Sequence, residues 1–132
     1  MPIRFNEFKR GQFFTLETVE EDEGDRVLEF LEELKVKRLA VLAGFKTIID
    51  FLADCPPPLR NNRFVAERDG IYVIKSGSHG PTSQGRIYCF FRRQNTLSLC
   101  NGAVKKKDKA DPADIDLALR LKRLAESMKG GR

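Results

Sequence analysis

The feature that most constrains the fold of this chain is an apolar run in its second half. Residues 86–91 read Arg-Ile-Tyr-Cys-Phe-Phe, so the side chains that alternate to opposite sides of a strand are apolar on both sides. Such a strand is typical of the interior of a sheet that is covered on both faces. We therefore expect the core to be built around a central strand at 86–91.

Two further strands are predicted next to this run in the sequence. Residues 71–75 are rich in β-branched and aromatic side chains and follow the turn pair Asp69 and Gly70. Residues 96–100 follow a turn at 93–95, which predicts a hairpin with the central strand. A loop is expected at 76–84, where two glycines and a proline occur. The three strands together predict an antiparallel meander.

The first half of the chain is predicted to hold one strand and two helices. Residues 12–19 have the composition of a strand, which the acidic block at 20–25 ends because that block is too polar to pack. Asp25 is the expected N-cap of a helix at 26–35, and apolar spacings of three and four residues predict a second helix at 37–53. This pair is expected to form a helical hairpin, which the prolines at 56–58 end.

A last helix is predicted to begin with Asp111 as its N-cap and Pro112 at its first position. Its expected buried face consists of Leu117, Leu121, Leu124 and Met128. The order of strand, two helices, three strands and helix predicts a single α+β domain over residues 1–132. No apolar run approaches the roughly 20 residues that span a bilayer, and no secretory signal is evident, so a soluble cytoplasmic protein is expected.

Charge is distributed unevenly along the chain. The net charge is +5, but residues 1–59 carry 8 Lys/Arg against 12 Asp/Glu, whereas residues 60–132 carry 16 against 7. This asymmetry favours a C-terminal half that faces a polyanion and an acidic N-terminal face. A solvated lysine surface is the ordinary alternative.

The sequence offers little for metal, nucleotide or conventional hydrolase chemistry. Cys55, Cys89 and Cys100 have no metal-ligand or disulfide spacing, and two of them lie in predicted strands, so buried reduced thiols are expected. The single histidine, His79, lies in a predicted loop and cannot form a histidine pair. No common catalytic or nucleotide-binding motif is present. We therefore expect no metal and no cofactor.

Cations at the ends of the predicted strands are the main candidates for function. Lys75 ends one strand, Arg86 begins the next, and a run of three lysines at 105–107 follows the third. A meander can bring these groups together on one face, where they would bind phosphates. The possible rim cations are Arg63, Arg68, Arg92 and Arg93, and Tyr72 and Tyr88 are candidates for stacking on a base. Solubility and protection of strand edges explain such lysines equally well.

The same segments resemble the RelE/ParE toxin superfamily, and most closely its HigB-like, phage-derived branch. The resemblance rests on the glycine-led strand at 70–75, the arginine-led strand at 86–91, the strand at 97–106 that runs into a double lysine, the proline-started helix at 111–115, and the first helix at 27–34. Together these pieces span about four-fifths of the chain in one order.

This resemblance implies a ribosome-dependent mRNA endoribonuclease, the toxin of a type II toxin–antitoxin system, paired with a cognate antitoxin, usually a helix-turn-helix protein. Such enzymes need no metal, and the ribose 2′-hydroxyl attacks the neighbouring phosphate. By position, Lys75 and Arg86 would contact the scissile phosphate, and Lys105 and Lys106 would orient the RNA. Lys75, Arg86 and Lys105 are therefore the candidate catalytic residues. The candidate RNA-binding residues are Lys106, Lys107, Arg68, Arg92, Arg93, Tyr72 and Tyr88.

Two positions depart from the pattern of that branch. Asn101 stands where many relatives have histidine, and Lys75 stands where they usually have arginine. Either change is compatible with weaker cleavage or with binding alone. Two alternatives therefore stay open: a ParE-like inhibitor of DNA gyrase, and a non-catalytic protein of phage origin that binds nucleic acid or an acidic partner.

Overall fold

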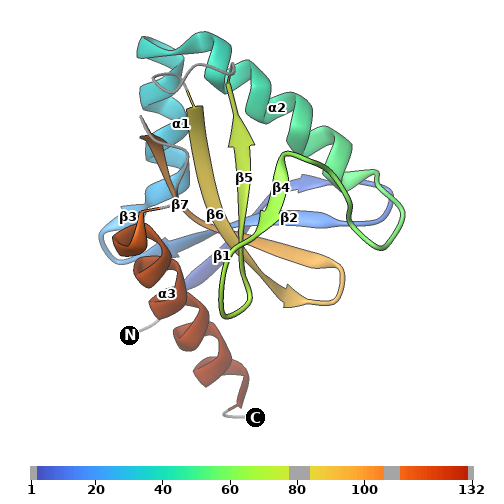
Figure 1. Cartoon of the computed structure of the whole chain (residues 1–132). Helices are drawn as coiled ribbons and strands as arrows, with labels where there is room; N and C mark the ends of the chain where they lie inside the picture. The colour runs from blue at the N-terminus through green and yellow to red at the C-terminus, as the bar shows by residue number, and fades with distance from the viewer. Residues whose placement is uncertain (1–2, 78–83, 106–110, 131–132) are drawn as a thin grey trace.

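A computed structural model describes residues 3–77, 84–105 and 111–130 of the chain (Figure 1). The predicted meander is present as three long neighbouring strands. The N-terminal region forms a hairpin followed by two helices, and one helix ends the chain. In order, the elements are β1 (Arg4–Arg10), β2 (Thr15–Glu21), β3 (Gly24–Asp25), α1 (Arg26–Lys37), α2 (Leu39–Ala53), β4 (Phe64–Ala66), β5 (Ile71–Ser76), β6 (Gln84–Arg93), β7 (Thr96–Lys105) and α3 (Pro112–Gly130).

The strands form one mixed sheet with the order β1-β2-β7-β6-β5-β4, to which β3 adds by pairing with β2. β5, β6 and β7 are antiparallel neighbours, so the predicted meander is confirmed. β2 lies parallel to β7, with Thr15 to Thr18 paired to Thr96 to Leu99. The sheet therefore joins the N-terminal hairpin to the last strand of the meander.

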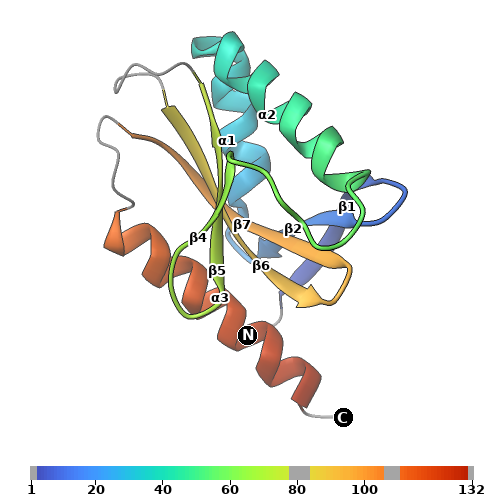
Figure 2. The same cartoon turned by 45° about the vertical axis from the view of Figure 1, so that its right-hand side comes forward.

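Helices cover both faces of the sheet, as the apolar run at 86–91 predicted. Ile87 and Cys89 belong to the core under α1 and α2, whereas Tyr88 and Phe90 belong to the core under α3. Figure 2 shows the sheet between these two helical layers. Because side chains alternate along β6, one strand contributes to both cores.

The N-terminal segment differs from the prediction in two ways. β1 was not predicted, because four of its seven residues are charged and it lies at an edge of the sheet. The acidic block was expected to stay unpacked, yet it continues β2 and contains the buried Glu21. Arg26 Nε and Arg120 Nη1 contact the two Glu21 carboxylate oxygens at 3.0 Å and 3.2 Å, which compensates the buried charge.

The helix boundaries follow local signals. Asp25 is the N-cap of α1 as predicted, since its carboxylate accepts a hydrogen bond from the backbone N–H of Leu28 at 3.0 Å. Only Arg38 separates α1 from α2. α3 begins at Pro112 as predicted, with the Ala113 N–H bonded to the Asp111 carboxylate at 2.9 Å.

The buried face of α3 is rotated from the predicted one. Met128 is 47% exposed, and Leu117 and Leu124 are only partly buried, although Leu121 is fully buried. The residues that contact the sheet most closely are Ile115, Ala118, Leu119, Leu121 and Ala125. Two alanines in this stripe let the helix axis approach the strands, which the larger side chains at the predicted positions do not allow. In the part of the chain that the structure describes, no helix is long and apolar enough to cross a membrane.

Candidate nucleic-acid interface

The meander places two of the predicted catalytic residues side by side at one end of the sheet. Lys75 on β5 pairs directly with Arg86 on β6, and Arg86 pairs with Ala103 on β7. The backbone of Lys105 pairs with Gln84, two residues from Arg86. Strand alternation directs Lys75 and Arg86 to the α3 face of the sheet, together with Val73 and Tyr88 of the core under α3.

The two cations differ in how much of their surface is exposed to solvent. Arg86 has no exposed surface, whereas Lys75 is partly exposed. Lys75 is therefore accessible to a ligand, whereas Arg86 cannot touch one directly in this structure. Among the other predicted residues, Lys106, Lys107 and the loop histidine His79 lie outside the described residues, and of Lys105 only the backbone is described.

The two tyrosines do not form the stacking surface that was expected. Tyr88 is completely buried under α3, whereas Tyr72 pairs with Cys89 and lies on the opposite face of the sheet. The ring of Tyr72 stacks on Phe64 with 5.0 Å between the ring centroids and packs edge-on against Phe91. A base cannot reach Tyr88 in this structure, and Tyr72 lies on the face away from Lys75.

An open hollow of about 580 Å³ exposes part of this aromatic cluster. Phe64, Tyr72 and Phe91 form its base, and Pro57 and Pro58 lie at its rim. It is mostly apolar and lies on the same face of the sheet as α1 and α2. Tyr72 is therefore available to an apolar or aromatic group, but separately from the cations.

Two of the four predicted rim arginines are engaged in ion pairs. Arg92 donates two hydrogen bonds to the buried carboxylate of Glu17, and this interaction raises the pKa of Arg92. Arg68 contacts Asp116 at 2.7 Å, which likewise raises its pKa. Arg93 is exposed, but it lies seven residues along β6 from Arg86, roughly 23 Å away along the strand. The structure therefore does not gather these three arginines around Lys75.

Three more cations lie at the same end of the sheet as Lys75: the predicted rim residue Arg63, and Lys37 and Arg38, which were not predicted. Lys37 and Arg38, at the junction of α1 and α2, border Ala103 and Val104 near the end of β7. Arg63 donates to the backbone carbonyl of Gly77 at 3.3 Å, just beyond β5. The sequence does show three basic residues close together, Lys35, Lys37 and Arg38, which could have indicated a candidate binding surface. Its position beside the meander depends on the packing of the helical hairpin.

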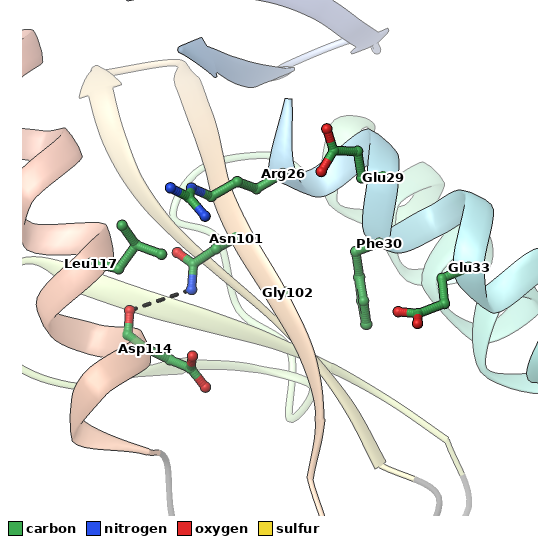
Figure 3. Close-up of a pocket in the computed structure, with 8 residues that line it drawn as sticks. All are labelled: Arg26, Glu29, Phe30, Glu33, Asn101, Gly102, Asp114 and Leu117. Atoms are coloured by element: carbon green, nitrogen blue, oxygen red, sulfur yellow. Dashed lines mark hydrogen bonds between the residues drawn. The ribbon is translucent and has the colours of Figure 1, made fainter. Parts of the chain in front are cut away.

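A cleft between α1, β7 and α3 is a second feature that the sequence did not predict. Its volume is about 560 Å³. Figure 3 shows Asn101 and Gly102 of β7 between the two helices. The cleft is lined by Arg26, Glu29, Phe30, Glu33, Asn101, Gly102, Asp114 and Leu117. Three of these residues are acidic, so this cleft is a poor place for RNA.

The cysteines match the prediction of buried, reduced thiols at 89 and 100. All three cysteines are free, and Cys89 and Cys100 are buried. Burial raises the pKa of both thiols well above the ordinary value, so they stay protonated at neutral pH. Within the described residues, no group of three or more histidine, cysteine or acidic side chains is arranged to hold a metal ion.

Comparison with known proteins adds no assignment. No protein-family model matches the chain, and no curated protein is significantly similar to it in sequence.

Proposed function

We propose that this protein is the toxin of a type II toxin–antitoxin system, with the fold of the RelE superfamily, and that it cleaves mRNA on the ribosome. The observation that carries the proposal is the pairing of Lys75 with Arg86 at the end of the β5-β6-β7 meander. The order β2-β7-β6-β5, with two helices on one face, is consistent with a RelE-like topology. The cations at the α1–α2 junction extend the positive surface at that end.

The proposed reaction is attack of a ribose 2′-hydroxyl on the adjacent phosphate. The bond to the 5′-oxygen of the next nucleotide breaks, which leaves a cyclic phosphate and a 5′-hydroxyl. Lys75 contacts the phosphate and stabilises the charge that develops on it, while the buried charge of Arg86 raises the local positive potential. The lysines at 105–107 hold the flanking RNA. One of them takes the proton of the attacking 2′-hydroxyl and passes it to the departing 5′-oxygen.

The test is inducible expression in bacteria, followed by growth measurement and primer extension on a translated message. The wild type is expected to stop growth and to produce new 5′ ends within codons. Lys75→Ala is expected to reduce cleavage about 100-fold, the scale for removing one charge-stabilising group. Lys46→Ala is the matched control, because Lys46 is exposed on α2 and makes no ion pair within the described residues.

Arg86→Lys tests the buried charge separately, since it keeps the charge and shortens the side chain. If Lys75→Ala and Lys46→Ala leave growth arrest equally strong, the assignment of the site is wrong. If the wild type arrests growth and produces no new 5′ ends in messages, the proposal of RNA cleavage is wrong. Growth arrest that co-expression of a neighbouring helix-turn-helix protein relieves would support the antitoxin partnership.

The burial of Arg86 favours one alternative, a relative of these toxins that binds without cutting. Cleavage by cations alone needs several of them on the substrate, and only Lys75 of the predicted catalytic set has described exposed atoms. A protein of this kind would shift RNA in a gel and leave it intact. A gyrase inhibitor would instead produce DNA breaks trapped on gyrase.

A further inference from the structure

The second half of β7 has an open edge. β2 pairs with β7 only as far as Leu99, whereas β6 pairs with β7 along the other side as far as Lys105. On the side of β2, residues 100–105 therefore have no strand partner in the described part of the chain. A strand edge of this kind presents backbone N–H and C=O groups that another extended chain can pair with.

Two helices make this edge the floor of a cleft. α1 contributes Phe30 and Glu33 on one side, and α3 contributes Asp114 and Leu117 on the other (Figure 3). A second hollow of about 280 Å³ continues along Gly102, Ala103 and Val104 toward the end of the strand. The two hollows share Phe30, Glu33 and Gly102, so together they follow β7 for about four residues. We call this continuous space the β7 edge cleft.

The small side chains in the floor keep the backbone accessible. A Cβ atom at Gly102 would overlap the ring of Phe30, so the ring packs directly on the backbone of the strand. Ala103 follows with a single methyl group. A chain laid along this edge would lie beside the ring of Phe30 and against the backbone of residues 102–103.

The charge of the walls indicates the chemistry of the occupant. Glu29 and Glu33 are exposed on consecutive turns of α1, and Asp114 faces them from α3. Glu33 pairs with Lys37 at 3.4 Å, and Lys37 and Arg38 line the other end of the cleft, near Val104. Arg26 also lines the cleft, but its guanidinium is bound to Glu21 at 3.0 Å. Glu29 has no ion-pair partner in the described parts of the chain. The end of the cleft near Asn101 therefore favours positive side chains and repels a nucleic-acid backbone.

We propose that the β7 edge cleft binds an extended, basic segment of a partner protein by adding it as a strand beside residues 100–105 of β7. The edge lies between α1 and α3, so an extended segment reaches it more readily than a second folded copy of this protein. Strand pairing supplies the affinity, and a lysine or arginine side chain that meets Glu29 supplies the selectivity. This proposal does not depend on RNA cleavage.

The probe is a synthetic, fluorescein-labelled peptide of eight residues in which valine and lysine alternate, and binding is followed by fluorescence anisotropy. The same peptide with glutamate in place of lysine tests charge. A version with N-methylated amides along one edge tests backbone pairing. The basic peptide is expected to bind at micromolar concentration, and each of the other two at least about tenfold more weakly.

Two charge reversals on α1 locate the bound peptide. Glu29→Lys is expected to weaken binding at least about fivefold. Glu32→Lys is the matched control, since Glu32 is exposed on the same helix but does not line the cleft, and it is expected to change binding less than about twofold. Lys75→Ala is expected to leave peptide binding unchanged, so failure of the RNA proposal and failure of this one are distinguishable.

Amide hydrogen exchange gives an independent readout. The bound basic peptide is expected to slow exchange of amides within residues 100–105 that the free protein leaves open. Equal binding of the acidic peptide, equal effects of Glu29→Lys and Glu32→Lys, or unchanged exchange in this segment would each overturn the proposal. Protection of the same amides by a single-stranded RNA oligonucleotide would assign the cleft to RNA instead.

Discussion

Removing the guanidinium of Arg92 should lower the stability of the fold and leave RNA binding unchanged. Its partner, Glu17, is only 5% exposed and also accepts a hydrogen bond from Ser98, so the carboxylate cannot recover water when Arg92 is lost. Arg92 also lies over the ring of Phe5, with the guanidinium carbon 4.1 Å from the ring centroid. The substitution to examine is Arg92→Leu, which keeps the apolar stem and removes the charge.

The expected cost follows from leaving the buried carboxylate of Glu17 without its cation. Breaking a buried ion pair costs about 3–5 kcal/mol, and the hydrogen bond from Ser98 remains, so a value at the lower end is expected. We therefore expect Arg92→Leu to lower the free energy of unfolding by about 3 kcal/mol at pH 7. For a domain of this size, that corresponds to roughly 12 °C in Tm.

Urea unfolding followed by circular dichroism measures this loss, with Arg93→Leu as the control. Arg93 is the adjacent residue, is exposed and has no ion pair within the described residues, so its change should be below about 0.5 kcal/mol. If Arg92→Leu lowers the free energy of unfolding by less than about 1 kcal/mol and also weakens RNA binding, the structural role of Arg92 is wrong. The prediction from the sequence that Arg92 binds RNA would then hold.

Three further predictions concern packing and burial. Gly102→Ala should destabilise the fold by about 1–3 kcal/mol in urea unfolding, because the new methyl group overlaps the ring of Phe30; an unchanged midpoint would contradict this packing. The thiol of Cys55 should react with a disulfide reagent in the folded protein, whereas Cys89 and Cys100 should react only after unfolding. Because burial raises the pKa of both buried thiols, their contribution to stability is complete below the ordinary thiol pKa of about 8.5 and is lost as the pH rises above it. A urea midpoint that is unchanged between pH 7.5 and pH 9.5 would contradict that expectation.

Local patterns predicted much of the fold because they depend on neighbouring residues. The N-cap at Asp25 and the proline at 112 set helix starts that the structure reproduces. The alternation at 86–91 correctly indicated a strand with a core on each face. The edge strand β1 escaped prediction because an edge strand needs one buried face at most, and charged residues occupy it readily.

The candidate site was predicted less well, because a list of cations does not say which faces they share. Lys75 and Arg86 are cross-strand neighbours as the meander predicted. Tyr72 and Tyr88 lie on opposite faces, since the register pairs Tyr72 with Cys89. A shift by one residue reverses the face of every side chain in a strand, and no short pattern in this sequence fixes the register.

The sequence by itself determined the elements around the central strand and the order in which charged residues follow them. Only the tertiary structure decided that β2 lies parallel to β7 and stops pairing at Leu99. It also decided that Arg86 is buried and that α1 and α3 form the walls of the β7 edge cleft. Hairpins and helix ends are set by contacts within a few residues. The pairing of strands about 80 residues apart, and the burial of a charged side chain, depend on how all the apolar surfaces are covered at once.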